Sequence, residues 1–420
     1  MGFIKHTFER LLPRFAYRAL VAPYHLLFSF LAASKYGFPA RKLKVIAVTG
    51  TKGKSSVTEM IAAILEGAGH RVALSSTIHF RINGKSVPNL YKMTLPGKGF
   101  IQKFLRDAVA EGCDFAVIEV SSEAAVQYRH LFLSLNALVF TNLAKEHLES
   151  HGGMENYFKA KLRIGRELER SAKRPRAIIG NADDEYGKRF LKLRVENRIP
   201  FSLQDATDIA ATEKGVSFTY DRVSIGLPHP GTFSVLNALA AIKAAAFFNV
   251  DTKTSAAALH ALTKIAGRAE RIECGQDFTA VVDYAHTPDS LQALYDAFPG
   301  RKICVLGNTG GGRDTWKRPA MGRIASEACD EVILTDEDPY DEDPRAIVEA
   351  MAAGMEKKPL IIMDRREAIA TALSHAKKGD SVLISGKGTD PYIMKANGGK
   401  LRWSDADVVR EELGKLGHGA

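Results

Sequence analysis

Seven consecutive residues are the first candidates for chemistry in the chain. Residues 50–56 read Gly-Thr-Lys-Gly-Lys-Ser-Ser and stand between a short β-branched run and a helical pattern. Backbone N–H groups of such a turn, together with the start of the helix, form a cradle for phosphate oxygens. The lysine before the serines can reach the outer phosphates, and the first serine can bind Mg²⁺. An ordinary glycine-rich turn explains the glycines, but it does not explain a Gly-Lys-Ser sequence placed at the start of a helix. We therefore predict that ATP is bound by Gly50, Thr51, Lys52, Gly53, Lys54, Ser55 and Ser56.

Short apolar runs alternate with helical patterns on both sides of this loop. The pattern predicts strands and helices of a doubly wound, mostly parallel α/β sheet with a phosphate loop at a strand end. Residues 181–226 are expected to be irregular and rich in turns. The predicted strands are 43–49, 115–120 and 137–141, and the predicted helices are 57–67 and 237–248.

A second α/β pattern begins near Gly267 and predicts a Rossmann-like carboxy-terminal domain. Polar or glycine-rich residues follow each strand, at the edge where ligands bind in open α/β sheets. The predicted strands are 280–284, 302–306, 331–335, 360–363 and 381–385, with helices at 289–297 and 366–376. We predict an arm over 1–40, a central domain with the phosphate loop over 41–266 and a second α/β domain over 267–420.

The first 40 residues differ from the rest and are expected to form a basic, apolar helical arm. They hold three arginines between positions 10 and 18, and an apolar run over 20–33 that Pro23 and His25 interrupt. A spanning helix needs about 20 apolar residues, and the cleavage pattern of a signal peptide is absent. Two interpretations stay open: the arm docks on the body or on a second copy, or it lies on a membrane surface.

Charge and cysteine content narrow the class of protein. The 420 residues carry a formal net charge of +10, which suits either nucleic acid or anionic small molecules. The sequence shows no nucleic-acid module, so we expect small-molecule substrates and no nucleic-acid partner. Cys113, Cys274, Cys304 and Cys329 lie far apart, which argues against a zinc site or a disulfide scaffold and suits a reducing cytoplasm.

The phosphate loop and its flanks resemble the ATP loop of the Mur ligase superfamily. Residues 48–55 read Val-Thr-Gly-Thr-Lys-Gly-Lys-Ser, with two residues between the glycines where the general loop has four. The resemblance spans about residues 44–415 and is closest to the MurE type, which adds the third residue of the peptidoglycan stem peptide. It implies a ligase that activates a carboxylate with ATP and Mg²⁺ as an acyl phosphate, which an amine then attacks.

The resemblance also implies a magnesium site. His147 stands in Glu-His-Leu-Glu where the family has Asp-His-Leu-Asp, and Lys161 matches a lysine that the family carbamylates into an anion. Lys159 is the alternative if the register slips. Taken singly, Glu119 is a surface glutamate beside a strand and Lys161 a solvated lysine. The expected metal ligands are Ser55, Glu119, His147 and carbamylated Lys161; the expected catalytic residues are Lys54, Glu119, His147 and Lys161.

Further matches assign residues to the nucleotide and the acceptor. Asn237 matches a contact to adenine, and Arg268 matches an arginine that reaches the ATP phosphates. Asp283 and His286 match residues on the ribose and adenine side, although Asp283 alone suggests a helix cap. The acceptor is expected to contact Thr94, Ser122, Gln127 and Arg129. Glu123 follows the serines where the family has histidine.

The amino-acid pocket is expected in the carboxy-terminal domain. The Gly-Gly-Gly-Arg-Asp motif at 310–314 resembles one whose arginine grips an α-carboxylate through a bidentate fork. The specificity loop reads Glu-Asp-Pro-Tyr where diaminopimelate enzymes have Asp-Asn-Pro-Arg, so Tyr340 supplies no cation. Its acids predict a cationic amino acid such as lysine or ornithine, unless they face solvent. The expected pocket residues are Arg313, Asp314, Glu337, Asp338, Tyr340, Gly386 and Asp390.

One departure from the family concerns the acceptor. About 40 residues precede the ATP domain, which leaves no room for the uridine-binding domain with which MurE-type enzymes begin. The arm and the central domain would then hold the nucleotide sugar, or the acceptor is a lipid-linked or shortened precursor.

Two other functions stay under consideration. One is a superfamily ligase that extends a γ-glutamyl, cyanophycin-like or folate acceptor, and the other is a non-catalytic ATP-binding scaffold. The segments Glu-Val-Ser-Ser and Asp-Tyr-Ala-His-Thr-Pro argue against a folate enzyme. Intact Lys54, Glu119, His147 and Lys161 argue against a scaffold. We expect a cytoplasmic enzyme of cell-wall synthesis, with the arm contacting the membrane surface or a second copy.

Overall fold

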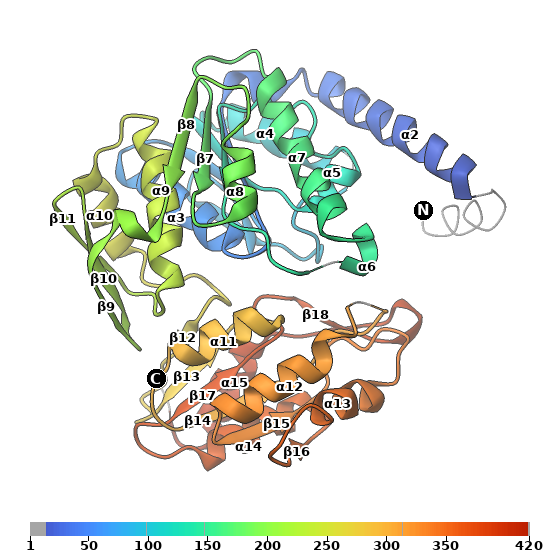
Figure 1. Cartoon of the computed structure of the whole chain (residues 1–420), viewed down its shortest axis with the longest axis vertical. Coiled ribbons are helices and arrows are strands. Elements are labelled where there is room, and N and C mark those ends of the chain that lie inside the picture. The colour runs from blue at the N-terminus through green and yellow to red at the C-terminus, as the bar shows by residue number, and fades with distance from the viewer. Residues whose placement is uncertain (1–13, 98, 147, 313, 419–420) are drawn as a thin grey trace.

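Two α/β bodies stack on each other in the computed structural model, and one long helix projects from the upper body (Figure 1). The structure describes residues 14–97, 99–146, 148–312 and 314–418. His147 and Arg313, both predicted site residues, lie outside these ranges.

An eight-stranded sheet forms the centre of the upper body. Its order is β4-β3-β2-β5-β1-β6-β7-β8. Neighbouring strands pair in parallel from β2 through β5, β1, β6 and β7 to β8. At the other edge, β3 and β4 are antiparallel. The strands are β1 Lys44–Thr49, β2 Val72–Ser75, β3 His79–Ile82, β4 Lys85–Pro88, β5 Phe115–Glu119, β6 Ala137–Phe140, β7 Ala177–Asn181 and β8 Asn197–Phe201.

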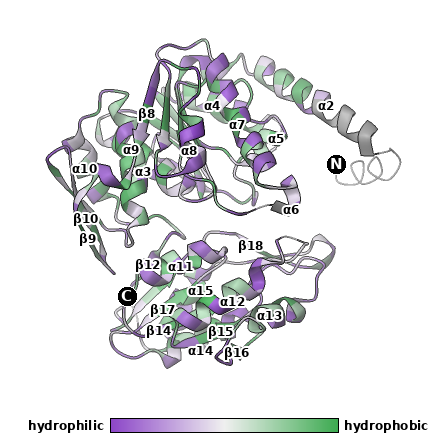
Figure 2. Ribbon diagram, viewed as in Figure 1, coloured by the Kyte–Doolittle hydropathy of each residue, from purple (hydrophilic) through white to green (hydrophobic). Residues whose placement is uncertain are grey.

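Helices cover both faces of this sheet, because β1 and its parallel neighbours are apolar on both sides. One face carries α3 Lys54–Gly67, α9 Phe233–Ala246 and α10 Thr252–Ala261; the other carries α4 Phe100–Ala110, α5 Ser122–Val126, α7 Met154–Arg170 and α8 Glu185–Phe190. Figure 2 shows hydrophobic residues along these elements. The prediction of a doubly wound, mostly parallel sheet is confirmed.

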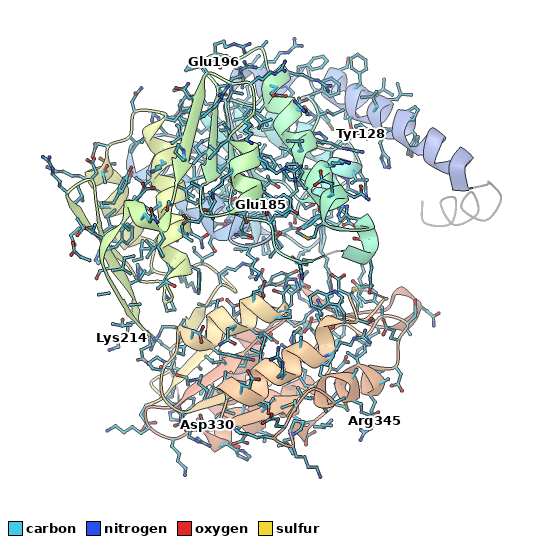
Figure 3. All side chains as sticks on the ribbon, in the orientation of Figure 1. Tyr128, Glu185, Glu196, Lys214, Asp330 and Arg345 are labelled. Atoms are coloured by element: carbon cyan, nitrogen blue, oxygen red, sulfur yellow. A yellow bond between two sulfur atoms is a disulfide. The ribbon has the colours of Figure 1, made fainter. Side chains whose placement is uncertain are left out.

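The prediction that residues 181–226 are irregular is wrong. Besides β8, they form an antiparallel sheet of β9 Thr207–Thr212, β10 Gly215–Tyr220 and β11 Val223–Leu227. Asp221 and Arg222, with φ of 49° and 61°, turn the chain between β10 and β11. β9 is exposed along most of its length, whereas β10 and β11 alternate buried apolar and more exposed residues, a short strand pattern that the prediction overlooked. Lys214, at the tip of the β9–β10 hairpin, is labelled in Figure 3.

The lower body has a six-stranded sheet of order β12-β13-β17-β14-β15-β16, parallel except for β12. Its strands are β12 Glu270–Ile272, β13 Thr279–Val282, β14 Lys302–Leu306, β15 Glu331–Leu334, β16 Leu360–Ile361 and β17 Ser381–Ile384. One face packs on α11 Pro288–Asp296, α12 Lys317–Ala328 and α13 Pro344–Ala352, and the other on α14 Arg365–His375 and α15 Asp405–Lys415. A hairpin of β18 Tyr392–Met394 and β19 Lys400–Arg402 completes this body. The second predicted α/β unit is therefore confirmed.

Cys304 and Cys329 form a disulfide, a single bridge that the argument against a disulfide scaffold did not anticipate. The two cysteines are 25 residues apart in the chain. Cys304 lies in β14, and Cys329 ends the α12 crossover that leads to the neighbouring strand β15. The crossover brings together two cysteines that are distant from each other in the sequence.

The amino-terminal arm contains α2, a helix over Arg14–Lys35 that includes Pro23. It touches the upper body where Ser29 Oγ donates a hydrogen bond to the Tyr128 carbonyl oxygen at 3.0 Å. Tyr128 is labelled beside α2 in Figure 3. Within the described part of the chain, we find no helix with the length and apolar character that crossing a bilayer requires.

Candidate active site

A cleft of about 1840 Å³ lies between the two bodies and collects most of the predicted site residues. The upper wall supplies Thr51, Lys52, Gly53, Lys54, Ser55, Ser56, Thr94, Glu119, Ser122, Gln127, Arg129 and Asn237. The lower wall supplies Arg268, Asp283, His286, Asp314, Asp338, Tyr340, Gly386 and Asp390.

The phosphate loop links the end of β1 to the start of α3, as the sequence predicted. Gly53 caps the helix with φ +77°, and a Cβ there would lie 2.4 Å from the Asn237 amide oxygen. Asn237, on α9, therefore packs directly on the loop. Lys54 Nζ donates to the Thr51 carbonyl oxygen at 2.8 Å, which folds its ammonium over the loop.

A hydrogen-bonded chain joins the loop to the ends of the neighbouring strands. Ser55 Oγ donates to Glu119 Oε2 at 2.9 Å and accepts from Arg268 at 3.1 Å. Thr77 donates to Glu119 from both its N–H (2.9 Å) and its hydroxyl (3.0 Å), and its hydroxyl lies 2.9 Å from that of Thr94. Predicted phosphate, metal and acceptor residues thus meet in one network. Sequence reasoning missed Thr77, since a threonine after a short strand carries no distinctive signal.

Lys161 lies behind the phosphate loop on α7. Its side chain is buried, and Nζ donates to the Gly50 carbonyl oxygen at 2.6 Å. Burial lowers the pKa of the Lys161 ammonium well below its usual value, and the positive charge of Lys54 lowers it further. When the pKa of a lysine is lowered, a larger fraction of its side chain is present as the neutral, nucleophilic amine than in a solvated lysine.

The predicted acceptor residues lie at one end of the upper wall. Arg129 donates to the Leu95 carbonyl oxygen at 2.6 Å and to the side-chain oxygen of Gln127. Ser122 Oγ lies 3.1 Å from the His151 ring nitrogen Nε2. A carboxylate or phosphate entering this end meets hydroxyl, amide and guanidinium donors together.

Several contacts join the two walls directly. His286 lies with one ring nitrogen 2.7 Å from the Tyr284 carbonyl oxygen and the other 2.7 Å from Glu146 Oε1. The Asp314 N–H donates to Glu149 at 2.7 Å, and Lys52 pairs with Asp289 at 3.1 Å. Glu146 and Glu149 are the two acids that exceed the family pattern by one methylene, and both reach across the cleft. The structure is therefore closed around the site.

Asp283 is more enclosed than its predicted ribose contact suggests. Its carboxylate accepts backbone N–H bonds from Ala269 and Ala285, each at 2.6 Å. Burial raises the pKa of Asp283 despite these bonds. The side chain holds the chain before β12 and after β13 in place, which is a structural use beside the predicted one.

Two lysines pair with carboxylates of the acidic pocket that the sequence predicted. Asp338 pairs with the buried Lys387 at 2.9 Å and with Lys92, which also lies 3.3 Å from Asp390. Burial alone would raise the pKa of Asp338, but Lys387 and Lys92 together lower it. Lys92 comes from the upper wall, 246 residues away from Asp338, and no sequence motif marks it. The two lysines therefore offset the charges of Asp338 and Asp390, two of the predicted acids.

The remaining pocket residues pack around this cluster. Glu337 is buried, accepts from the Thr309 hydroxyl at 2.8 Å, and fills the space beside Gly386, where a Cβ would lie 2.2 Å from its Oε2. The ring centroid of Tyr340 lies 5.7 Å from Lys92 Nζ. The alternative that these acids face solvent is therefore wrong for Glu337 and Asp338.

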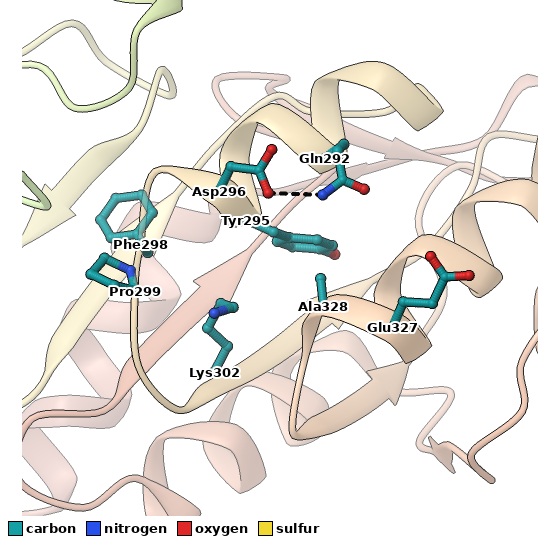
Figure 4. Close-up of a pocket in the computed structure, with 8 residues that line it drawn as sticks. All are labelled: Gln292, Tyr295, Asp296, Phe298, Pro299, Lys302, Glu327 and Ala328. Carbon is teal, nitrogen blue, oxygen red and sulfur yellow. Dashed lines mark hydrogen bonds between the residues drawn. The ribbon is translucent and has the colours of Figure 1, made fainter. Parts of the chain in front are cut away.

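A second, smaller pocket of about 290 Å³ opens on the lower body (Figure 4). Gln292, Tyr295 and Asp296 of α11 line it, and Gln292 donates to Asp296 at 2.8 Å. No predicted site residue lines it. The large cleft is therefore the candidate active site.

Comparison with known proteins finds a matching family domain for each of the two bodies. Residues 48–245 match the Mur ligase middle domain, and residues 267–388 match the Mur ligase, glutamate ligase domain. A UDP-N-acetylmuramoyl-L-alanyl-D-glutamate–2,6-diaminopimelate ligase of Trichormus variabilis is 38% identical over 402 residues, covering 91% of this chain and 79% of the relative. A UDP-N-acetylmuramyl-tripeptide synthetase of Roseiflexus sp. is 36% identical, covering 93% and 82%.

Solved structures share the fold. A UDP-N-acetylmuramoyl-L-alanyl-D-glutamate–2,6-diaminopimelate ligase superposes with a TM-score of 0.61 at 30% identity, covering 90% of this chain and 79% of that one. Mycobacterium tuberculosis folylpolyglutamate synthase reaches a TM-score of 0.70 at 17% identity, covering 87% and 93%. The latter likeness concerns the fold alone.

Proposed function

The chain belongs to the Mur ligase family of ATP-dependent amide ligases, and from that premise we propose that it joins a diamino acid to the D-glutamate carboxylate of UDP-N-acetylmuramoyl-L-alanyl-D-glutamate. The observation that carries the proposal is the single cleft in which the phosphate loop, the acceptor residues and the amino-acid pocket face one another. Transfer of the γ-phosphate to the acceptor carboxylate gives an acyl phosphate and ADP. Attack by the amine then forms the amide and releases phosphate.

The residues near the loop fit a magnesium ion. The Ser55 hydroxyl and the Glu119 carboxylate converge at 2.9 Å, and hard oxygen donors of this kind suit Mg²⁺. We propose Ser55, Glu119, His147 and carbamylated Lys161 as its ligands, His147 on sequence alone. The ion would neutralise negative charge on the phosphates. Lys54 and Arg268 add positive charge at the same place, which favours phosphoryl transfer.

Carbamylation of Lys161 is part of the proposal. Its Nζ is buried and lies 2.6 Å from the loop carbonyl of Gly50, so an anion there would face the phosphate site. Addition of CO₂ to the neutral amine forms a carbamate and releases one proton. The intact mass of the protein, measured with and without bicarbonate, tests this step, and the Lys161→Met variant is the control.

Two kinds of amino acid are candidates for the second substrate. The specificity loop favours lysine or ornithine, because Tyr340 offers no cation for a distal carboxylate. The position of Lys92 favours diaminopimelate as a second candidate, because its ammonium reaches the pocket from the opposite wall. Asp390 is the proposed partner of the side-chain ammonium in either case.

The site of action follows from the substrates. Nucleotide-linked precursors and ATP belong to the cytoplasm, so we propose that the chain acts there in peptidoglycan synthesis, which supports cell shape and division. Closure of the two walls keeps water from the acyl phosphate, as the contacts across the cleft allow.

The test is phosphate release with ATP, Mg²⁺ and the UDP-muramoyl dipeptide against a panel of amino acids. Turnover with lysine, ornithine or diaminopimelate supports the proposal and identifies the amino acid. Turnover only with a γ-glutamyl or lipid-linked acceptor keeps the ligase chemistry but overturns the acceptor.

A further inference from the structure

Helix α2 turns a side with small residues toward the protein. Ser29 hydrogen-bonds Tyr128, and Ala33, one turn later, is completely buried. The Phe30 ring lies 5.8 Å from the ring of Phe132, which anchors the flank of the helix. The direction of these contacts fixes which face of α2 meets the upper body.

The opposite face of α2 is apolar and exposed. Leu27 and Leu31, one turn apart, are 54% and 50% exposed, and Leu26 beside them is 46% exposed. Phe28, 37% exposed, continues the same stripe at helical spacing. Figure 2 shows this part of α2 as a hydrophobic segment extending from the body. Leucines in water-exposed helices are normally isolated, so an exposed stripe of this kind points to a non-aqueous partner.

The charges around α2 select the partner. Residues 10–44 contain seven lysine or arginine residues and no acidic residue. A second copy of the chain would bring an equally basic segment to the same place, and the two would repel. An anionic lipid surface attracts basic residues and accepts an apolar helix face at the same time.

The location of α2 relative to the cleft agrees with a surface role. Tyr24 and His25 line the same cleft as Gln127 and Arg129, the proposed acceptor residues. A bilayer against the outer face of α2 would therefore lie near the acceptor end of the cleft. We propose that α2 binds the surface of an anionic membrane through its exposed leucines and the surrounding basic residues.

The test is co-sedimentation of the full chain with lipid vesicles. Binding to vesicles of phosphatidylglycerol and phosphatidylcholine, weak binding to phosphatidylcholine alone, and release at high salt are the expected results. The double variant Leu27→Gln/Leu31→Gln is expected to lose about tenfold or more in vesicle affinity. Leu401→Gln, at a residue 49% exposed on the lower body, is the matched control and should bind as the unchanged chain does.

Amide ligation by both variants with soluble substrates checks that they fold. Absence of vesicle binding by the unchanged chain overturns the proposal. So does a dimer in lipid-free solution that the double variant dissociates, because the leucines would then cover a second copy. Equal binding by the double variant and the unchanged chain would also overturn it.

Discussion

The two walls of the cleft are assembled in different ways. On the upper wall, residues 50–56 are consecutive, and the turn between β1 and α3 presents residues 51–56 to the cleft, where we propose that the phosphates bind. On the lower wall, Asp338 and Asp390 follow different strands, and their charges are balanced by Lys387 below and Lys92 above. The proposed phosphate site is formed by a local turn. The proposed amino-acid pocket is formed by contacts that exist only when both bodies are together.

This difference bears on how each site tolerates change. A turn of fixed sequence preserves its backbone N–H groups in any closed or open arrangement of the bodies. The proposed amino-acid pocket depends on closure, because Lys92 reaches it across the cleft from the upper wall. Variation in specificity is therefore expected at the lower wall, and loss of the chemical step at the upper wall.

The largest expected effect is on the phosphate side. Lys54→Ala removes the ammonium that folds over the loop, and kcat is expected to fall about 10³-fold, because transition-state charge on the phosphates loses its partner. The KM of the amino acid should change little. Steady-state phosphate release measures both, and Lys85→Ala, on the exposed edge strand β4, is the control. A fall in kcat of less than about tenfold would contradict the role of Lys54.

Acid should destabilise the upper body through His130. Burial lowers the pKa of His130 to about 4 from its ordinary 6.5. Between these values the unfolded chain binds a proton that the folded chain does not, so stability falls as pH drops from 6.5 to 4. The loss attributable to this residue is about 3 kcal/mol.

Urea unfolding at neutral pH and near pH 4 measures this loss in the unchanged chain and in His130→Gln, which should lose less. His260→Gln, at an exposed histidine on α10, is the control. An identical acid loss in the His130 variant and the unchanged chain would assign the acid sensitivity to other groups.

Removal of Lys92 sharpens the comparison at the lower wall. Lys92→Gln leaves Asp338 with one buried cation and is expected to change the KM of the amino acid by about 10- to 100-fold, with kcat within a few-fold. Diaminopimelate should lose more than lysine, because only its distal carboxylate can use the ammonium. The measurement is kcat and KM for both amino acids. A change in kcat alone would place Lys92 with the chemical step instead.

The smallest expected effect comes from the exposed pair between the walls. Lys52 and Asp289 lie 3.1 Å apart but remain partly in solvent, and such pairs contribute little. Asp289→Ala should lower kcat/KM by less than about fivefold, with Asp296→Ala at the far end of α11 as the control. A much larger loss would mean that closure depends on this pair.

Contiguous patterns of the sequence carried over well into the structure. The alternation of apolar runs and helices predicted both α/β bodies, and β14 was predicted to its exact ends at Lys302 and Leu306. The β9–β11 sheet was missed, because β9 buries little apolar surface and the alternation in β10 and β11, although present, runs over only a few residues and was overlooked. The Cys304–Cys329 disulfide was missed because a crossover, not sequence spacing, makes its cysteines neighbours.

The sequence by itself determined the phosphate loop and the family, since the seven residues are consecutive and a local pattern identifies them, although Asn142 and Lys161 also hold the loop. Tertiary structure alone decided the charge of the amino-acid pocket and the outward direction of the α2 leucines. Lys92 meets Asp338 only after two separate sheets have formed and closed on each other. The outward direction of the α2 leucines accompanies contacts of Ser29, Phe30 and Ala33 with the upper body. Both outcomes depend on long-range packing, which local sequence patterns do not record.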